Sequence, residues 1–337
     1  MSRVVPSPSP SPAGAPPVLS VVVPMHNEQE VVPEMLARLL PVLEATGESY
    51  EVICVDDGST DATAALIAGA NDRDPRIKLL RFSRNFGKEN AMTAGIDWAA
   101  GAAVVIIDAD LQDPPELIPA MLEKWREGFD VVCGQRVSRR QDSWTKRTTA
   151  RWFYRVINSM SRVPVPENVG DFRLMDRRVV TALGRMHERN RFMKGLFAWV
   201  GFKTAYLPYE RPERHAGHSK FAYWRLWNFA LDGITGYSTL PLRISGYLGL
   251  ATALLAVIYA AFLVIRTLIL GVDAPGYAST MVVILFLGGV QLVVLGVIGE
   301  YLGRLYEESK ARPIYILDEA LGFAPPSAEP VGARRAG

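Results

Sequence analysis

The stretch that decides the fold is Ala102–Asp113, with the sequence AAVVIIDADLQD. Its first half, Ala102–Ile107, is an uncharged apolar run, as expected of a strand buried in a parallel sheet. Asp108 and Asp110 therefore follow the C-terminal end of a strand, which is where open α/β sheets bind their ligands. Clustered carboxylates repel each other unless a cation lies between them, and Mg²⁺ or Mn²⁺ is typically held by one or two carboxylates plus substrate phosphates. The stretch predicts a metal–phosphate site, and the alternative is an Asp-rich turn that caps the following helix.

Strand-like and helix-like patterns alternate from Leu19 onward. Short apolar runs predict strands, and apolar residues at helical spacing predict helices between them. This order implies an α/β fold with a mostly parallel sheet and helices on both faces. The predicted strands are Leu19–Val23, Glu51–Val55, Ile77–Phe82, Ala102–Ile107 and Asp130–Cys133, and the predicted helices are Glu28–Glu44, Thr60 or Asp61 to Ala70, and Asn90–Ala99.

Polar loops follow the first four predicted strands. Because these strand ends lie at one edge of a parallel sheet, a single ligand can contact all four loops. No G-x-G-x-x-G follows a strand and no G-x-x-x-x-G-K-[ST] occurs, which argues against a dinucleotide-binding fold and a P-loop NTPase. The loops are Pro24–Glu28 (PMHNE), Asp56–Ser59 (DDGS), Asn85–Asn90 (NFGKEN) and Asp108–Gln112 (DADLQ).

Two long segments without a charged side chain, Ile244–Ile265 and Ala278–Gly299, occupy the C-terminal third. Each is long enough to span the hydrocarbon core of a bilayer as a helix. The linker Thr267–Tyr277 is too short for a domain, so the segments predict a transmembrane hairpin, at about 244–266 and 278–300. Lys and Arg flank the hairpin and are missing from its linker. The positive-inside rule then places the α/β domain and both termini in the cytoplasm.

The remaining segments have distinct compositions. The N-terminus is rich in Pro and Ser and predicts a disordered tail without a secretory signal. Phe221–Tyr237 is rich in Trp and Phe, which suits helices in the membrane interface, and packing on the sheet is the alternative. The predicted organisation is a tail at 1–17, an α/β domain at 18–220, interfacial amphipathic helices at 221–243, the hairpin at 244–303 and a cytoplasmic C-terminal tail at 304–337.

The charge distribution is more informative than the total. A net charge of +2 predicts no nucleic-acid partner. The segment from Arg136 to Arg155, however, contains seven Lys and Arg residues and a single acidic residue, Asp142. This segment could bind a phosphate group or only lie against anionic lipid. Cys54 and Cys133 both lie in apolar runs, which predicts buried core thiols rather than a disulfide.

The ordered loop motifs resemble those of a known family. V-P-x-x-N-E, D-D-G-S-x-D, N-x-G-K and D-A-D-L-Q-D occur in the order found in inverting family-two glycosyltransferases with the GT-A fold. With GDFRLM (Gly170–Met175), ERHAGHSKF (Glu213–Phe221) and the two-helix tail, the chain resembles the polyisoprenyl-phosphate glycosyltransferases. These include dolichol-phosphate mannose synthase and the bacterial bactoprenol glucosyltransferases. The resemblance covers about Leu19 to Ile316.

The resemblance implies an activity at the cytoplasmic face of a bacterial inner membrane. A sugar would move from a nucleotide sugar to a polyprenyl phosphate, with Mg²⁺ or Mn²⁺ as cofactor. The bacterial branch favours UDP-glucose and undecaprenyl phosphate, while N-acetylglucosamine, galactose, amino-arabinose and mannose donors stay open. Related bacterial enzymes also suggest a homotetramer. The alternatives are a processive polysaccharide synthase, which two helices could not easily supply with a channel, and a membrane-docked module without activity.

The roles of individual residues follow from the resemblance alone. Asp108, Asp110, Asp171 and Arg214 are implied in catalysis, and Asp108, Asp110 and Gln112 in holding the metal. The residues implied in nucleotide-sugar binding are Pro24, Asn27, Glu28, Asp56, Asp57, Ser59, Gly87, Lys88, Asp108, Ala109 and Asp110. The residues implied in binding the lipid phosphate are Arg136, Arg139, Arg140, Lys146, Arg147 and Lys220.

Overall fold

The computed structural model describes residues 16–137, 169–186, 188–189, 191–210, 240–270 and 276–323. The chain divides into two compact units. The first contains the described residues up to 210 together with 313–323, and the second contains the described residues from 240 to 312.

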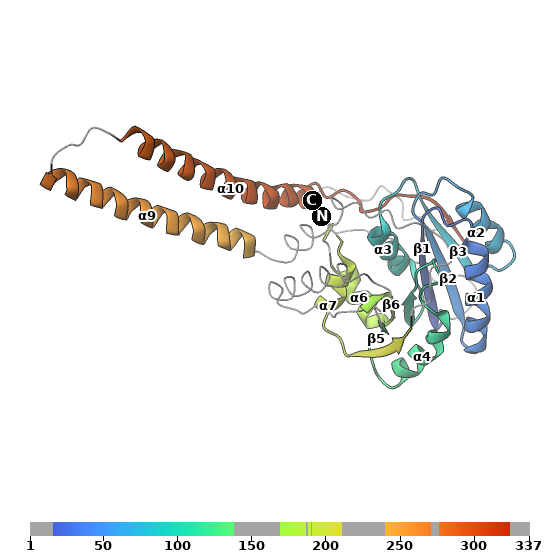
Figure 1. Cartoon of the computed structure of the whole chain (residues 1–337). Helices are drawn as coiled ribbons and strands as arrows, with labels where there is room; N and C mark the ends of the chain where they lie inside the picture. Colours follow the sequence, from blue (N-terminus) through green and yellow to red (C-terminus); the bar gives the residue numbers. More distant parts are fainter. Residues whose placement is uncertain are drawn as a thin grey trace, which may run out of the picture. The chain divides into compact units, whose positions relative to one another are not determined.

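Within the described residues, the first unit is built on an eight-stranded sheet with the order β7-β5-β6-β4-β1-β2-β3-β8 (Figure 1). β1 pairs in parallel with β2 and β4, β2 with β3, and β5 with β7, whereas β6 and β8 run antiparallel to their neighbours. The predicted α/β class with a mostly parallel sheet is confirmed. The strands are β1 Leu19–Met25, β2 Tyr50–Asp56, β3 Ile77–Phe82, β4 Ala103–Ile106, β5 Val131–Arg136, β6 Val169–Asp176, β7 Thr204–Tyr209 and β8 Leu317–Leu321.

Helices cover both faces of this sheet. α1, α2 and α4 bury apolar side chains in one cluster, and α3, α6 and α7 do so in a second. Successive side chains of a strand point to opposite faces, so Val21 and Val23 of β1 join the first cluster and Val22 the second. The helices are α1 Val32–Ala45, α2 Thr63–Asn71, α3 Lys88–Trp98, α4 Ile118–Arg126, α6 Arg177–Gly184 and α7 Met193–Trp199, with a short 3₁₀ helix, η1, at Pro115–Leu117.

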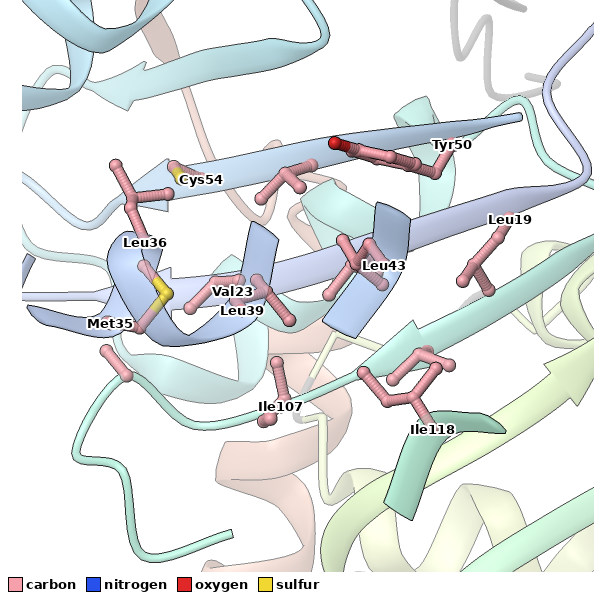
Figure 2. Packing of buried hydrophobic residues seen from close by; sticks show 14 of the residues in the cluster. Leu19, Val23, Met35, Leu36, Leu39, Leu43, Tyr50, Cys54, Ile107 and Ile118 are labelled. Atoms are coloured by element: carbon pink, nitrogen blue, oxygen red, sulfur yellow. The ribbon is translucent and has the colours of Figure 1, made fainter. Parts of the chain in front are cut away.

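The apolar stripe of α1 shows how a helix is attached to the sheet. Figure 2 shows Leu36, Leu39 and Leu43 of α1 beside the strands, with Leu39 next to Val23 of β1. Leu39 and Val23 are almost fully buried, at 1% and 0% exposure. Removing a buried Leu side chain typically costs about 2–5 kcal/mol of stability. The helix predicted at Glu28–Glu44 is present, but it begins at Val32, because residues 26–31 form a loop.

Cys54 and Cys133 are both buried and unpaired, as predicted.

The five predicted strands all exist, with ends shifted by a few residues. Strands β6, β7 and β8 have no counterpart among them. β8 lies within the segment predicted as a C-terminal tail and pairs with β3, where Tyr315 stacks on Phe82 at 5.1 Å between ring centroids.

The second unit holds two long helices, α9 (Leu240–Leu270) and α10 (Tyr277–Ser309), which pack against each other (Figure 1). Leu242–Ile269 and Val282–Ser309 are long and apolar enough to cross a membrane. Their apolar side chains are turned outward, as Leu250 shows with 68% exposure. A continuous apolar surface of this kind suits lipid rather than water. The predicted spans lie inside these two helices.

Candidate functional site

The carboxyl ends of β1, β2 and β4 meet at one edge of the sheet. β1 pairs with β2 on one side and with β4 on the other, so the strand order reverses here. Such a switch point leaves a crevice in which α/β proteins bind ligands. Asn27, Asp56 and Asp108 stand at or just after these strand ends.

Several hydrogen bonds tie the loop after β1 to the loop after β2 and to the start of α2. The Asn27 amide donates to Ser59 Oγ at 2.8 Å, and the Thr60 amide donates to Asn27 Oδ1 at 2.9 Å. The Glu28 amide donates to Thr63 Oγ1 at 2.9 Å. Asn27 has φ of 55°, in the left-handed region that Asn tolerates better than most residues. These contacts bring the predicted ligand residues Asn27, Glu28 and Ser59 together before any ligand binds.

Asp57 connects the second loop to the start of α3. Its carboxylate accepts hydrogen bonds from the amides of Phe86 at 2.6 Å and Gly87 at 2.9 Å. Burial raises the pKa of Asp57, although the two amides act in the opposite direction. Because both carboxylate oxygens are engaged by backbone, Asp57 positions the loop that precedes Lys88.

Gly58 makes the close approach of these two loops possible. It has φ of 64°, and a Cβ there would lie only 2.6 Å from the backbone nitrogen of Asn85. Asp56 beside it is fully buried and accepts a hydrogen bond from the Ser59 amide at 3.2 Å. The DDGS motif is therefore a compact turn whose carboxylates face into the protein.

Lys88 joins two carboxylates from distant parts of the chain. Its Nζ lies 2.6 Å from Asp108 Oδ1, and it donates to Asp171 Oδ2 at 2.8 Å. Asp108 follows β4, whereas Asp171 lies on β6, so three elements meet at this ammonium. Burial acts to raise the pKa of Asp171, but the charges of Lys88 and Lys194 hold it below its usual range. Burial acts to lower the pKa of Lys88, and the two carboxylates raise it above its usual range.

The acidic turn after β4 is bent at Leu111, which has φ of 57°. The Gln112 amide donates to Asp110 Oδ1 at 3.2 Å, so the turn closes on the side chain of Asp110. Asp113 is fully buried and accepts a hydrogen bond from the Tyr209 hydroxyl of β7. Three of the predicted residues, Asp108, Asp110 and Gln112, are thus held in one short turn.

Arg136, at the end of β5, contacts Tyr209 and lies near Asp113 of this turn. Its Nε donates to the Tyr209 hydroxyl at 3.3 Å, and its Nη2 lies 4.0 Å from Asp113. Burial and the neighbouring Asp113 raise the pKa of Tyr209, which keeps the phenol protonated. Neither Asp113 nor Tyr209 was among the site residues predicted from the sequence. The third Asp of the DADLQD motif was the signal that could have indicated Asp113.

Glu89 is a further residue near the site that was not predicted from the sequence. Its Oε2 accepts a hydrogen bond from the Met193 amide at 2.8 Å, which ties α3 to α7. Burial, and then the nearby charge of Asp171, raise the pKa of Glu89 to about 7. Its place beside Lys88 in NFGKEN could have drawn attention to it.

The donor set at this edge suits a cation that also takes ligands from its substrate. Asp171 Oδ1 is buried and receives no hydrogen bond from the described residues. Among those residues, no group of three or more His, Cys, Asp or Glu side chains could hold a metal ion alone. Mg²⁺ and Mn²⁺ need no such cage, because one or two carboxylates and substrate phosphates complete their shell. Asp108 and Asp110 fit that requirement.

The other predicted site residues are only partly covered. Pro24 lies within β1 and Ala109 is buried in the acidic turn. Gly87 precedes α3 with φ of 98°. The predicted residues that lie outside the described part of the chain are Arg139, Arg140, Lys146, Arg147, Arg214 and Lys220.

Two family models match the chain, Glycosyl transferase family 2 over residues 20–184 and GtrB C-terminal hairpin over residues 240–305. The chain is 55% identical over 305 residues to an uncharacterized glycosyltransferase of Synechocystis sp., covering 90% of this chain and 96% of that protein. It is 49% identical over 299 residues to the bactoprenol glucosyl transferase of Shigella phage SfV, covering 89% and 97%.

Among solved structures, the chain is similar to the mannosyltransferase PcManGT from Pyrobaculum calidifontis in complex with GDP-Man and Mn²⁺. That similarity spans 93% of this chain and 80% of the other, at 18% identity and a TM-score of 0.41. The family models and the sequence relatives agree with the strand-end loops and the helical hairpin described above. The chain belongs to glycosyl transferase family 2, carries a C-terminal hairpin of the GtrB type, and is a glycosyltransferase.

Proposed function

We propose that the protein transfers a sugar from a nucleotide sugar to a polyprenyl phosphate, with UDP-glucose and undecaprenyl phosphate as the favoured pair. The observation that carries this is the meeting of Asp108, Lys88 and Asp171 at the switch point of the sheet. Support for the lipid acceptor comes from the relatives named bactoprenol glucosyl transferase. The hairpin would keep such an acceptor's chain in the bilayer.

The donor would lie along the crevice. Its nucleoside would contact the joined loops of Asn27, Glu28 and Ser59, and its diphosphate would reach Asp108 and Asp110. A divalent cation bound there would stabilise the negative charge that develops on the leaving diphosphate. Lys88 supplies a further positive charge at the same edge.

The acceptor explains why no strong base is needed. A phosphate oxygen of the lipid, already anionic at neutral pH, would attack the anomeric carbon of the sugar. The bond from that carbon to the diphosphate breaks, and the nucleoside diphosphate leaves with the electron pair. The reaction then needs cationic side chains near both phosphate groups, and Arg suits this because its planar guanidinium binds phosphate through two donors. Arg214, Lys220 and the basic segment from Arg136 to Arg147 are proposed for this role.

A radiolabelled transfer assay tests this function. Purified protein in detergent, undecaprenyl phosphate and Mn²⁺ or Mg²⁺ would receive a panel of labelled nucleotide sugars, one at a time. We expect label to enter the organic phase from UDP-glucose and to stay out in EDTA. Asp110→Ala should lower the rate on the order of 10²-fold or more, whereas the exposed Asp72→Ala should not. No lipid-linked label from any donor would contradict the proposal, and label from a different donor would correct the sugar.

A further inference from the structure

A cavity of about 130 Å³ lies between α7 and the strands β5, β6 and β7. A single water needs only about 10–15 Å³ measured in this way, so the cavity has room for a group of several heavy atoms. Much of its wall is apolar, including Val131, Phe197 and Phe202. Two cationic side chains, Arg173 and Lys194, also line it.

Arg173 is the unusual member of this wall. It is 6% exposed, and its guanidinium carbon lies 3.8 Å from the centroid of the Phe197 ring. Its Nη2 donates to the carbonyl of Gly170 at 2.7 Å, and its Nε donates to that of Asp171 at 3.4 Å. It forms no ion pair with any carboxylate in the described ranges. Among the described residues, its charge is met by a ring face, two carbonyl oxygens and, at longer range, Asp171. Because no carboxylate is paired with the guanidinium directly, an anion bound in the cavity could pair with it.

Lys194 adds a second positive charge to the same space. It lies on α7, is half-buried, and forms no ion pair with the described residues. Its charge acts on Asp171 and Glu89, and the charge of Arg173 acts on Cys133 and Asp171. The cationic part of the cavity is therefore the part nearest to Asp171.

We propose that this cavity binds a phosphate monoester carried on an apolar chain. Arg173 and Lys194 would hold the phosphate, and Phe197, Phe202 and Tyr206 would contact the first carbons of the chain. Arg173 and Asp171 are two residues apart on β6, so their side chains share a face about 7 Å apart. The site rests on the proposed function, since a prenyl phosphate would be the acceptor. It adds Arg173 and Lys194 to the cationic side chains proposed for that phosphate and places the phosphate beside Asp171.

The test is ligand binding by the full chain in detergent, measured by calorimetry with geranyl phosphate and, separately, with inorganic phosphate. Lys194→Met removes one charge, and Ala198→Trp fills the cavity without touching a charge. Lys203→Met is the matched control, because Lys203 lies over the Phe129 ring and does not line the cavity. Thermal unfolding of each variant checks that it is folded.

We expect geranyl phosphate to bind at least tenfold more weakly to the Lys194 and Ala198 variants, and within twofold of the wild type in the control. We also expect it to bind more tightly than inorganic phosphate, because Phe197, Phe202 and Tyr206 would contact its chain. Equal affinity for the two ligands would overturn the chain-binding part and point to free phosphate. Unchanged binding in both cavity variants would overturn the site, and loss of binding in Arg139→Gln or Arg140→Gln would then assign the phosphate to the basic segment.

The transfer assay on the same samples separates the two proposals. If lipid-linked sugar forms but the cavity variants bind and react normally, the cavity proposal fails and the proposed function stands. If no donor labels any lipid while geranyl phosphate binding still depends on Lys194, the acceptor reaction fails and the phosphate site stands.

Discussion

Lys88 is the residue around which the candidate site is organised. Its ammonium lies between Asp108 and Asp171, which follow or belong to different strands and lie far apart in the sequence. Carboxylates this close to one another need a cation, and in this structure the protein itself supplies it. A divalent cation held by Asp108 would compete with the Lys88 ammonium for the negative charge of the Asp108 carboxylate. Binding of a diphosphate would offer Lys88 a different partner.

Replacing Lys88 tests this competition. In Lys88→Met the two carboxylates lose their cation, so we expect Mn²⁺ to bind roughly tenfold more tightly without nucleotide. Binding can be followed by electron paramagnetic resonance of free Mn²⁺. UDP should strengthen Mn²⁺ binding strongly in the wild type and only weakly in the variant. Lys124→Met, which removes an exposed lysine paired with Glu127, is the control and should leave Mn²⁺ binding unchanged. Unchanged or weaker binding in Lys88→Met would contradict the idea.

Glu89 should make stability depend on pH. Its pKa rises from 4.5 in the free side chain to about 7 in the fold, chiefly through burial. The folded state holds this proton more tightly, so the stability it contributes is full below pH 4.5 and is lost as pH rises through 7. We expect the melting temperature of the wild type to fall relative to Glu89→Gln between about pH 5 and 8. The exposed Glu123→Gln should follow the wild type at every pH, and parallel curves for all three proteins would rule out this role.

At the scale of elements, the pairing at the edge of the sheet shows which segments belong to the α/β domain. β3 would be an exposed edge, and unpaired edges invite association with other chains. β8 covers it, with the Ser83 amide donating to the carbonyl of Ile316 at 3.0 Å. Aromatic contacts secure the join, since Tyr315 stacks on Phe82 and Phe323 meets Trp98 edge-on at 4.9 Å. The strand after the hairpin is therefore part of the catalytic domain.

Tyr315→Ala tests how much this join stabilises the domain. The variant loses the stacked ring, and we expect unfolding to become easier by roughly 2–4 kcal/mol. Tyr315→Phe keeps the ring and loses only the hydroxyl, which lies 3.4 Å from Asp97, so its effect should stay under about 1 kcal/mol. Denaturant unfolding of the full chain in detergent gives both values. Equal losses in the two variants would show that stacking is not the cause.

At the scale of the whole molecule, one chain joins a sheet-based enzyme to two apolar helices. The sheet contains strands from both sides of the hairpin, because β1 to β7 precede α9 and β8 follows α10. Both covalent connections to the hairpin therefore come from the same domain. If α9 and α10 each cross a membrane once, we expect both ends of the hairpin to lie on the side that holds the sheet.

The linker of the hairpin should then face the opposite side. We expect Asp273→Cys to react with a membrane-impermeant maleimide in intact cells, because the positive-inside rule leaves the linker, which has no Lys or Arg after Arg266, outside. The native thiols Cys54 and Cys133 are buried and should stay silent. Ser327→Cys, in the C-terminal segment, should react only after the cells are permeabilised. The reverse pattern would invert the topology.

Local patterns predicted much of this protein from the sequence alone. Apolar runs located β1 to β5, because a strand buried on both faces needs a continuous apolar segment. The loops after the first four strands could be placed at one edge, because parallel strands end there. The hairpin followed from length and the absence of charge. The resemblance of the loop motifs then named the family, which the comparisons confirm.

Only the tertiary structure could decide the rest, because those features depend on residues far apart in the chain. β8, with the sequence LDEAL, has neither a continuous apolar run nor strict alternation that would predict a strand, and it is held as a strand by its pairing with β3. The Lys88 bridge requires β6 to bring Asp171 beside Asp108, and no spacing along the chain encodes that. The spacing of apolar residues indicates which face of a helix or strand is buried. Which carboxylates pair with a side chain such as Lys88 depends on how the helices and strands pack.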